Sequence, residues 1–330
     1  MSAERIWVGG YTADSNGSAE GIVLLEVAAD GTLQDRGLAV AADSPSFLTR
    51  SGNFIYAVGE AAPSVSAFSI HGSELRFAGT QDAAGGAPCA LAVLGDDAVL
   101  ATACYTDGVI DVHPLAADGT ILKTSQTLRG EGKGTRINQD GPHAHAVLRV
   151  GAATVLTTDL GSDVVYVHSF DGELLTRTGR IALPAGAGPR DLLLHPSGVV
   201  WVLTELSHEL YVLDGEDFSV VASVELPGAL PTDNSAAIAL SEDGRFAYAG
   251  SRGSDTVAVL AASPDGRVLT PVTSVPSGGG WPRHLVVDGS YLRVANQLTN
   301  SVDTFTIGGD GIPVPHSSIH VSSPTYLLLD

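Results

Sequence analysis

The chain has 330 residues, and 44% of them are hydrophobic, so it holds enough apolar material for one large core or two ordinary domains. No stretch approaches the roughly 18 consecutive apolar residues of a membrane-spanning helix. The formal net charge of −20 argues against binding to nucleic acids or anionic membranes, because both are themselves negatively charged.

The amino-terminal segment Met1–Arg5 runs directly into a strand pattern and lacks the apolar centre of a signal peptide. We therefore expect a soluble, cytoplasmic protein. The two cysteines, Cys89 and Cys104, have no Cys-x-x-Cys spacing, which argues against a disulfide framework and a structural zinc site. We interpret both as small buried residues.

A short apolar or alternating run that ends in a polar turn recurs seven times along the chain. These runs cover residues 6–10, 54–60, 98–105, 154–160, 199–206, 246–252 and 291–297. A second run follows each of them, at residues 22–27, 64–70, 108–114, 163–169, 208–213, 255–260 and 300–307. Alternation with β-branched residues predicts that both sets are strands.

A third apolar stretch precedes each first run, and we expect it to form the inner strand of each unit. These stretches begin near Ser46, Cys89, His145, Asp191, Ala236, His284 and Thr325. Their spacing is mostly about 43 to 48 residues, with a longer interval before His145 that holds an inserted Gly-rich loop. A less regular fourth strand is expected to complete each unit.

Four antiparallel strands repeated every 40–50 residues or so are typical of propeller blades. The sequence therefore predicts an all-β, seven-bladed β-propeller that occupies residues 1–330 as a single domain without a linker. The chain starts with a strand of the first set and ends with an inner strand. We expect the last blade to be closed by the N- and C-terminal strands, which leaves no unpaired edge at either.

In such a ring, the start of every inner strand and the end of the antiparallel strand beside it lie on the same rim. The inner-strand starts carry Pro45-Ser46-Phe47, Pro88-Cys89, Pro142-His143-Ala144-His145, Pro189-Arg190-Asp191, Asn234-Ser235-Ala236, Pro282-Arg283-His284 and Pro324-Thr325. The neighbouring strand ends carry Tyr11, Glu60, Cys104-Tyr105, Asp159, Glu205, Arg252 and Gln297. Histidines, carboxylates and arginines therefore converge on one face.

Two histidines and two carboxylates are candidates for acid–base chemistry on this rim. His143 and His145 are two residues apart, so on a strand they point the same way. We expect at least one of the two histidines to have a functional role. The alternative is that a histidine of this pair only caps a turn. Glu205 and Asp159 are either channel carboxylates or members of ion pairs between blades.

Three rim arginines, Arg190, Arg252 and Arg283, suit a substrate with a carboxylate or phosphate, because a guanidinium binds both bidentately. The alternative is that they only brace carboxylates. Lys133 and Arg136 lie in the inserted loop, which either folds over the channel mouth or stays in solvent.

A divalent cation is the remaining possibility for this face. Glu60, Asp159 and Glu205 are hard oxygen ligands of the kind that calcium takes. The interleaved arginines would repel a cation, so we expect no metal and no cofactor.

Short motifs, one from each blade, carry a resemblance that covers essentially the whole chain. They are Val8-Gly9-Gly10-Tyr11-Thr12, Gly85-Gly86-Ala87-Pro88-Cys89, Pro142-His143-Ala144-His145, Gly188-Pro189-Arg190, Asn234-Ser235-Ala236-Ala237, Ser251-Arg252-Gly253, Gly280-Trp281-Pro282-Arg283-His284 and Val294-Ala295-Asn296-Gln297. In this order they resemble the seven-bladed propeller lactonase family, of the bacterial 6-phosphogluconolactonase and fungal 3-carboxy-cis,cis-muconate lactonizing enzyme type.

The resemblance implies catalytic roles for His143 or His145 and for Arg190, Glu205 and Arg252. Substrate-binding candidates on or near the same rim are Arg283, His284, Asp159, Gln297, Arg136 and Tyr105. The chain departs from the family pattern at Ala90 and Asp191, where the family often has histidine, and at Ala237, where it usually has glutamate.

Hydrolysis of a sugar lactone, with 6-phosphogluconolactone as the first candidate, is the function that these residues favour. Glu205 or a channel histidine would act as general base, and no Gly-x-Ser-x-Gly nucleophile motif is present. The alternatives are the reverse chemistry, cyclisation of a muconate-like diacid, and a non-catalytic ligand-binding propeller. The expected partner is a small anionic carbohydrate or diacid, bound by a monomer or weak dimer.

Overall fold

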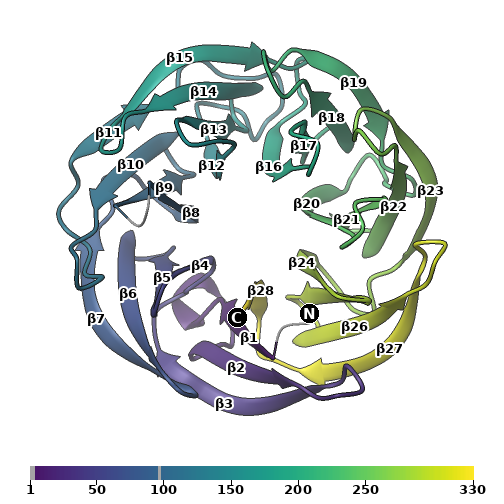
Figure 1. Ribbon diagram of the computed structural model, residues 1–330, viewed down its shortest axis with the longest axis horizontal. Coiled ribbons are helices and arrows are strands. Elements are labelled where there is room, and N and C mark those ends of the chain that lie inside the picture. The colour runs from purple at the N-terminus through teal and green to yellow at the C-terminus, as the bar shows by residue number, and fades with distance from the viewer. Residues whose placement is uncertain (1–3, 96–97) are drawn as a thin grey trace.

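Seven four-stranded antiparallel sheets surround a central channel like the blades of a propeller (Figure 1). The computed structural model describes residues 4–95 and 98–330, and within them it contains 28 strands and one short 3₁₀ helix, η1 (Ala13–Ser15). The all-β, seven-bladed fold predicted from the repeat is thus confirmed. Within these same ranges, no helix has the length and hydropathy needed to cross a membrane.

Each blade runs from an inner strand beside the channel to an outer strand at the periphery. The first four blades along the ring are β28 (Pro324–Leu329), β1 (Arg5–Gly10), β2 (Gly21–Val27) and β3 (Leu33–Ala41); β4 (Leu48–Ser51), β5 (Phe54–Gly59), β6 (Ser64–His71) and β7 (Glu74–Asp82); β8 (Pro88–Leu94), β9 (Val99–Cys104), β10 (Val109–Pro114) and β11 (Gln126–Arg129); and β12 (Ala144–Arg149), β13 (Thr154–Asp159), β14 (Val164–Phe170) and β15 (Leu175–Ala182).

The remaining three blades follow the same order from the channel outward. They are β16 (Pro189–Leu194), β17 (Val200–Thr204), β18 (Glu209–Leu213) and β19 (Val220–Glu225); β20 (Asn234–Leu240), β21 (Phe246–Arg252), β22 (Thr256–Ala262) and β23 (Leu269–Pro276); and β24 (Pro282–Asp288), β25 (Tyr291–Asn296), β26 (Ser301–Ile307) and β27 (Pro313–His320).

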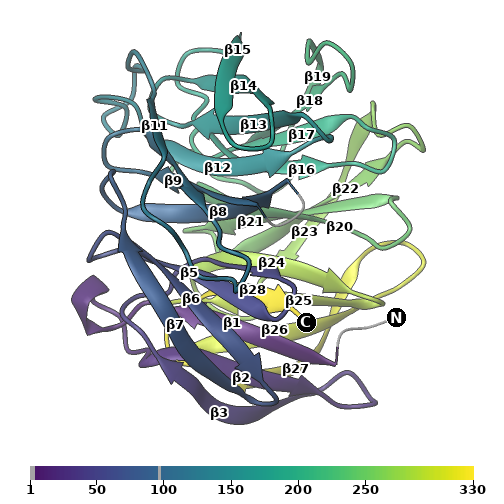
Figure 2. The same cartoon turned by 60° about the vertical axis from the view of Figure 1, so that its left-hand side comes forward.

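The two ends of the chain close the ring, as the sequence predicts. β28 pairs antiparallel with β1, with Ile6 opposite Leu329, and Figure 2 shows the two strands side by side. The side chain of Asp330 adds ion pairs to Arg5, at 2.6 Å, and to Arg50 of the neighbouring blade. The first and last strands therefore protect each other's backbone edges.

The outer strands are more regular than expected. Five of the seven, β3, β7, β15, β23 and β27, are eight or nine residues long, and only β11 is as short as four. Along these outer strands, most residues are exposed or half-buried, and neither face of the strand is strongly apolar. The hydrophobic pattern was therefore a poor guide to them, because these strands lie at the periphery of the ring.

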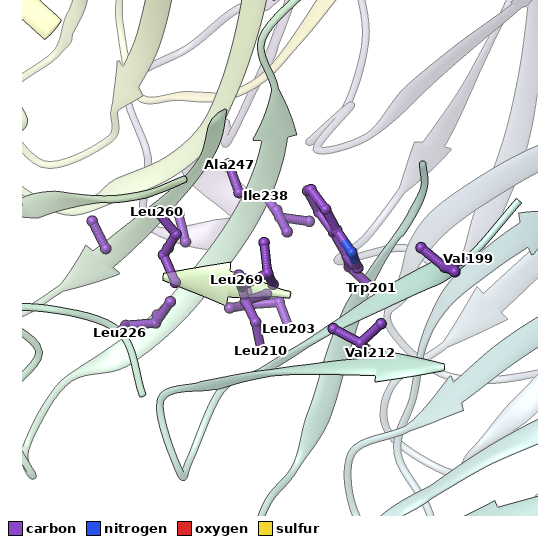
Figure 3. Packing of buried hydrophobic residues seen from close by; sticks show 12 residues of the cluster. Val199, Trp201, Leu203, Leu210, Val212, Leu226, Ile238, Ala247, Leu260 and Leu269 are labelled. Carbon is purple, nitrogen blue, oxygen red and sulfur yellow. The ribbon is translucent and has the colours of Figure 1, made fainter. Parts of the chain in front are cut away.

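The hydrophobic core lies between blades. In the cluster shown in Figure 3, Trp201 and Leu203 of β17 pack against Ile238 and Ala247 of the next blade. The Trp201 indole N–H donates to the carbonyl of Gly266, at 2.9 Å. Since burying a large aromatic side chain contributes on the order of 1.5–3 kcal/mol, such layers hold neighbouring blades at a fixed angle.

Sharp turns lead into the inner strands. A residue with positive φ immediately precedes the inner-strand proline in five blades; these residues are Ser44, Ala87, Gly188, Trp281 and Ser323. Register shifts follow at the start of β8, β12, β16, β20 and β24, and opposite the start of β28. These β-bulges re-aim the side chains that the strands present to the channel.

Candidate functional site in the central channel

A cavity of about 330 Å³ occupies the axis of the ring. Two consecutive residues from each blade, in the inner strand or immediately before it, contribute to its wall. The first residue of each pair belongs to what we call the first ring, which comprises Ser46, Cys89, His145, Arg190, Ala236, Arg283 and Thr325. The next residues form the second ring, which comprises Phe47, Ala90, Ala146, Asp191, Ala237, His284 and Tyr326.

An unbroken strand would send consecutive side chains to opposite faces. In β16, Pro189 lies opposite Thr204 and Asp191 lies opposite Leu203, which leaves Arg190 as an extra residue without a partner. In β24, Arg283 is the extra residue in the same way. The bulges are therefore the reason that both rings line one cavity. Leu48, Leu91, Val147, Leu192 and Ile238 continue the wall as an apolar layer.

Glu205 directly follows β17 and lies between Arg190 and Arg252; neither Glu205 nor Arg252 lines the cavity itself. Glu205 accepts a hydrogen bond from Nη1 of Arg190, and Nη2 of Arg252 lies 2.9 Å from its Oε2 as an ion pair without hydrogen-bond alignment. Burial favours the neutral acid, but Arg190 and Arg252 outweigh burial and hold the pKa of Glu205 below its ordinary value. This carboxylate stays ionised and fixes two guanidiniums.

Backbone and aromatic contacts complete the positioning of these arginines. Nε of Arg190 donates to the carbonyl of Ala236, at 2.8 Å, and Nε of Arg252 donates to that of Asn234, at 3.0 Å. The Arg252 guanidinium also lies 5.4 Å from the ring centroid of Trp281. Contacts from a neighbouring blade thus help to hold each arginine in one geometry.

Arg283 has a neutral hydrogen-bond partner instead of a carboxylate. Its Nη2 donates to the Tyr11 hydroxyl, which in turn donates to Glu60 at 2.9 Å. Ser46 donates to the same carboxylate. Burial raises the pKa of Tyr11, so its hydroxyl stays protonated at neutral pH. Among the three rim arginines, Arg283 is therefore the one whose charge no direct ion pair neutralises.

The two candidate histidines do not share one orientation. His143 precedes the first residue of β12, so the alternation of a strand does not apply to it. Its ring stacks on Tyr105 at 4.5 Å, and its Nδ1 lies 2.7 Å from the carbonyl oxygen of Tyr105. Only His145 lines the cavity, where burial, followed by the three arginines, lowers its pKa well below the ordinary value.

Asp159 differs from the prediction, because it lies one position before the residue that reaches the rim. Asp159 is opposite Ala144, just as Thr204 is opposite Pro189, so the counterpart of Glu205 in this blade is Leu160. The Asp159 carboxylate is 1% exposed and accepts the backbone N–H groups of His143, Gly161 and Ser162. It fixes the turn after β13 and does not line the cavity.

The inserted loop also lies away from the cavity wall. Buried Gln139 anchors it by donating to the carbonyl of Leu160, at 2.8 Å, and to Asp163, at 2.6 Å. Lys133 and Arg136 are exposed, and Arg136 lines a separate groove beside Ser207 and His208. Of the two alternatives for this loop, the exposed position in solvent describes Lys133 and Arg136, and neither side chain lines the cavity.

The remaining substrate-binding candidates fall into two groups. His284 is in the second ring, where its Nδ1 accepts the N–H of Leu327 and burial lowers its pKa to about 3. Tyr105 and Gln297 occupy the rim position of Glu205 in their blades and do not line the cavity wall. Asp191, noticed in the sequence only as a departure from a pattern, is part of the wall.

The next question is whether the described residues include a possible metal site. Within residues 4–95 and 98–330, no three His, Cys, Asp or Glu side chains are grouped so that they could hold a metal ion. Glu60, Asp159 and Glu205, the three oxygen ligands considered from the sequence, each have protein partners instead.

The fold and this channel define a closed β-propeller with an arginine- and carboxylate-lined axial cavity. A family model described as "Lactonase, 7-bladed beta-propeller" matches residues 5–328. The chain belongs to this family of seven-bladed β-propeller lactonases.

Similar proteins extend over nearly the whole chain. A 6-phosphogluconolactonase of Bacillus subtilis is 31% identical over 316 residues, which cover 91% of this chain and 90% of the relative. The crystal structure of a putative 6-phosphogluconolactonase from Bacteroides fragilis is 26% identical, with a TM-score of 0.91 and coverage of 99% and 98% of the two chains. A periplasmic gluconolactonase of Pseudomonas aeruginosa, 23% identical with a TM-score of 0.90 and 98% coverage of both chains, shares the fold.

Proposed function

We propose that this protein hydrolyses a sugar lactone in the axial cavity, with 6-phosphogluconolactone as the first candidate substrate. The observation that carries the proposal is the pair of arginines in the cavity wall, Arg190 and Arg283, which Glu205, Tyr11 and the carbonyl of Ala236 hold in place. The family and the 6-phosphogluconolactonase among the relatives support the same reaction.

The charge distribution suggests how an anionic lactone would bind. Arg283 lines the cavity and has no carboxylate as a direct partner, so it is suited to a phosphate or carboxylate group of the substrate. Arg190, which shares the Glu205 carboxylate with Arg252, lines the cavity and presents preorganised donors to the oxygen on which negative charge develops when water attacks the carbonyl.

A lactone is an activated ester, so acid–base assistance suffices without a covalent nucleophile. The lowered pKa values of Glu205 and His145 make both weak bases. We assign to Glu205 the positioning of the arginines, and to His145 a hydrogen bond to the substrate as a neutral imidazole.

The direct test is hydrolysis of freshly generated 6-phosphogluconolactone above its spontaneous rate, with glucono-lactone as the matched substrate without phosphate. We expect acceleration by the wild type, a loss of about 10²-fold or more in kcat/KM in Glu205→Gln and His145→Ala, and a preference for the phosphorylated lactone. Arg283→Met should remove that preference while leaving turnover of glucono-lactone nearly unchanged.

A wild-type rate equal to the background with both lactones, at high enzyme concentration, would contradict the proposal. Cyclisation of a muconate-like diacid would then be assayed with the same variants. Binding of 6-phosphogluconate without any turnover would instead indicate a ligand-binding propeller.

A further inference from the structure

One inner strand places a cation and a carboxylate side by side in the cavity. Arg190 and Asp191 are consecutive residues, yet the bulge at Arg190 directs both toward the channel, one in the first ring and one in the second. A substrate atom bound by Arg190 would therefore lie next to Asp191. No other blade combines a guanidinium and a carboxylate in its two ring positions, which are all among the described residues.

Asp191 is held by backbone groups and by no cation. Its Oδ1 accepts the N–H of Leu192, at 2.9 Å, and its Oδ2 accepts the N–H of Ile238 on the adjacent inner strand, at 3.1 Å. Each oxygen keeps a further acceptor site. Its neighbours in the second ring are Ala146 and Ala237, whose small side chains leave the carboxylate accessible from the cavity.

The other titratable and charged groups that line the cavity have different contacts. They are Glu60, Cys89, His145, Arg190, Arg283, His284 and Tyr326. Glu60 accepts hydrogen bonds from Tyr11 and Ser46, and Nδ1 of His284 is occupied by the N–H of Leu327. Burial raises the pKa of the Cys89 thiol and lowers that of both cavity histidines, so none of the three is a strong base at neutral pH.

The electrostatics at Asp191 act in the opposite direction from those at Glu205. Burial raises the pKa of Asp191, and the N–H groups of Ile238 and Leu192 and the charge of Arg190 offset only part of that effect. An aspartate with a raised pKa binds a proton more readily than an ordinary one, as a general base must.

We propose that Asp191 is the general base of lactone hydrolysis and that Arg190, beside it, binds the carbonyl oxygen. This inference rests on the proposed function. Asp191 takes a proton from water as the water oxygen bonds to the carbonyl carbon, and the carbonyl electron pair moves to the oxygen held by Arg190. When the C=O bond re-forms, the ring C–O bond breaks, and the leaving oxygen takes the proton from Asp191. The product is the hydroxy acid, and water is the only co-reactant.

A purely structural role is the competing explanation, because Asp191 also links β16 to β20 through the N–H of Ile238. Kinetic, stability and binding measurements distinguish the catalytic role from the structural one. A base contributes to kcat and to its pH dependence, whereas a link between strands contributes to stability and to ligand affinity.

The experiment combines kinetics with product binding in matched variants. Asp191→Asn should lower kcat by about 10²–10⁴-fold and keep the affinity for 6-phosphogluconate, measured by calorimetry, within about threefold. The wild-type kcat should fall as the pH drops through the raised pKa of Asp191, and Asp191→Asn should lack this acidic limb.

Two further variants keep the proposal testable if Asp191→Asn does not fold. Asp191→Ala should regain activity, by about tenfold or more, with added sodium formate but not with sodium chloride at equal ionic strength. Asp191→Glu should retain a measurable part of kcat. The control is Asp111→Asn, a buried carboxylate away from the cavity that accepts the N–H of Ala84 and the Thr127 hydroxyl, which should keep the wild-type kcat.

Three results would overturn the assignment of Asp191 alone. They are a kcat of Asp191→Asn within threefold of the wild type, an unchanged acidic limb, and a parallel loss of kcat and product affinity without rescue by formate. A wild-type protein that hydrolyses no lactone would overturn the proposed function, and this inference with it.

Discussion

At the scale of single residues, the cavity is defined by how each charge is compensated. Glu205 is shared by Arg190 and Arg252, Arg283 contacts a protonated tyrosine, and Asp191 accepts only backbone N–H groups. These differences are the basis of the positioning, substrate-binding and proton-transfer roles that we propose for residues of the same type. Burial also keeps the second-ring histidine, His284, neutral, and its Nδ1 accepts the N–H of Leu327.

His284 gives a prediction on the pH dependence of stability. Its pKa in the fold is about 3, below the value of about 6.5 for an unfolded histidine, so protonation favours the unfolded state. The stability that neutral His284 contributes is complete above pH 6.5 or so and is lost as the pH falls from there toward 3. We expect the wild type to lose about 2 kcal/mol more than His284→Gln between pH 7 and pH 5, at about 1.4 kcal/mol per pH unit.

Urea unfolding at both pH values measures this difference. Tyr326→Phe is the control, since Tyr326 lies 3.9 Å from the same imidazole and does not titrate in this range. Equal losses of stability in the wild type and in His284→Gln would show that His284 is not held in its neutral form.

At the scale of elements, the inner strands combine a regular hydrogen-bond ladder with one irregular position. The bulge places two side chains per blade in the channel, and the turn before it ends the loop from the preceding blade. Carboxylates that accept backbone N–H groups hold the turns at this rim, as Asp159 at the end of β13 does.

Substitution of Asp159 tests whether this carboxylate stabilises a turn or takes part in binding in the cavity. Asp159→Ala leaves the N–H groups of His143, Gly161 and Ser162 without their buried acceptor, so we expect a loss of about 2–4 kcal/mol in the free energy of unfolding. The affinity for 6-phosphogluconate should stay nearly unchanged. Asp171→Ala, at an exposed turn where the carboxylate accepts two N–H groups, should cost less than about 1 kcal/mol.

Denaturation curves and calorimetric titration of both variants provide the comparison. If Asp159→Ala were as stable as the wild type but bound 6-phosphogluconate much more weakly, Asp159 would belong to the substrate site, as the sequence predicted.

At the scale of the whole molecule, the ring is closed by one short strand from the end of the chain. β28 contributes a complete inner strand, including Thr325 and Tyr326 of the cavity wall, and pairs with β1. Removing it would open the ring, expose the edge of β1 and remove part of the site.

A chain truncated after Ser323 should therefore unfold with a midpoint well below that of the wild type, with a stability loss of more than about 3 kcal/mol, and should associate in size-exclusion chromatography. Adding a peptide of residues 324–330 should restore the wild-type elution volume and stability. Asp330→Asn keeps the β28 hydrogen bonds and weakens only the ion pairs to Arg5 and Arg50, so its loss should be smaller. A truncated chain as stable as the wild type would contradict this role of β28.

The repeat in the sequence was sufficient to predict seven blades, the closure by the terminal strands and the convergence of Arg190, Glu205, Arg252 and Arg283 on one rim. Strand periodicity and turn residues are local properties, so a single chain displays them directly. They did not reveal that Asp159 is one position out of register with Glu205, or that the bulges turn a second residue of each inner strand into the channel. Nor did they distinguish the ion-paired Glu205 from the unpaired Asp191. A bulge is set by hydrogen bonds to the neighbouring strand, and the charge state of a carboxylate is set by groups from other blades, so both arise only when the ring is assembled.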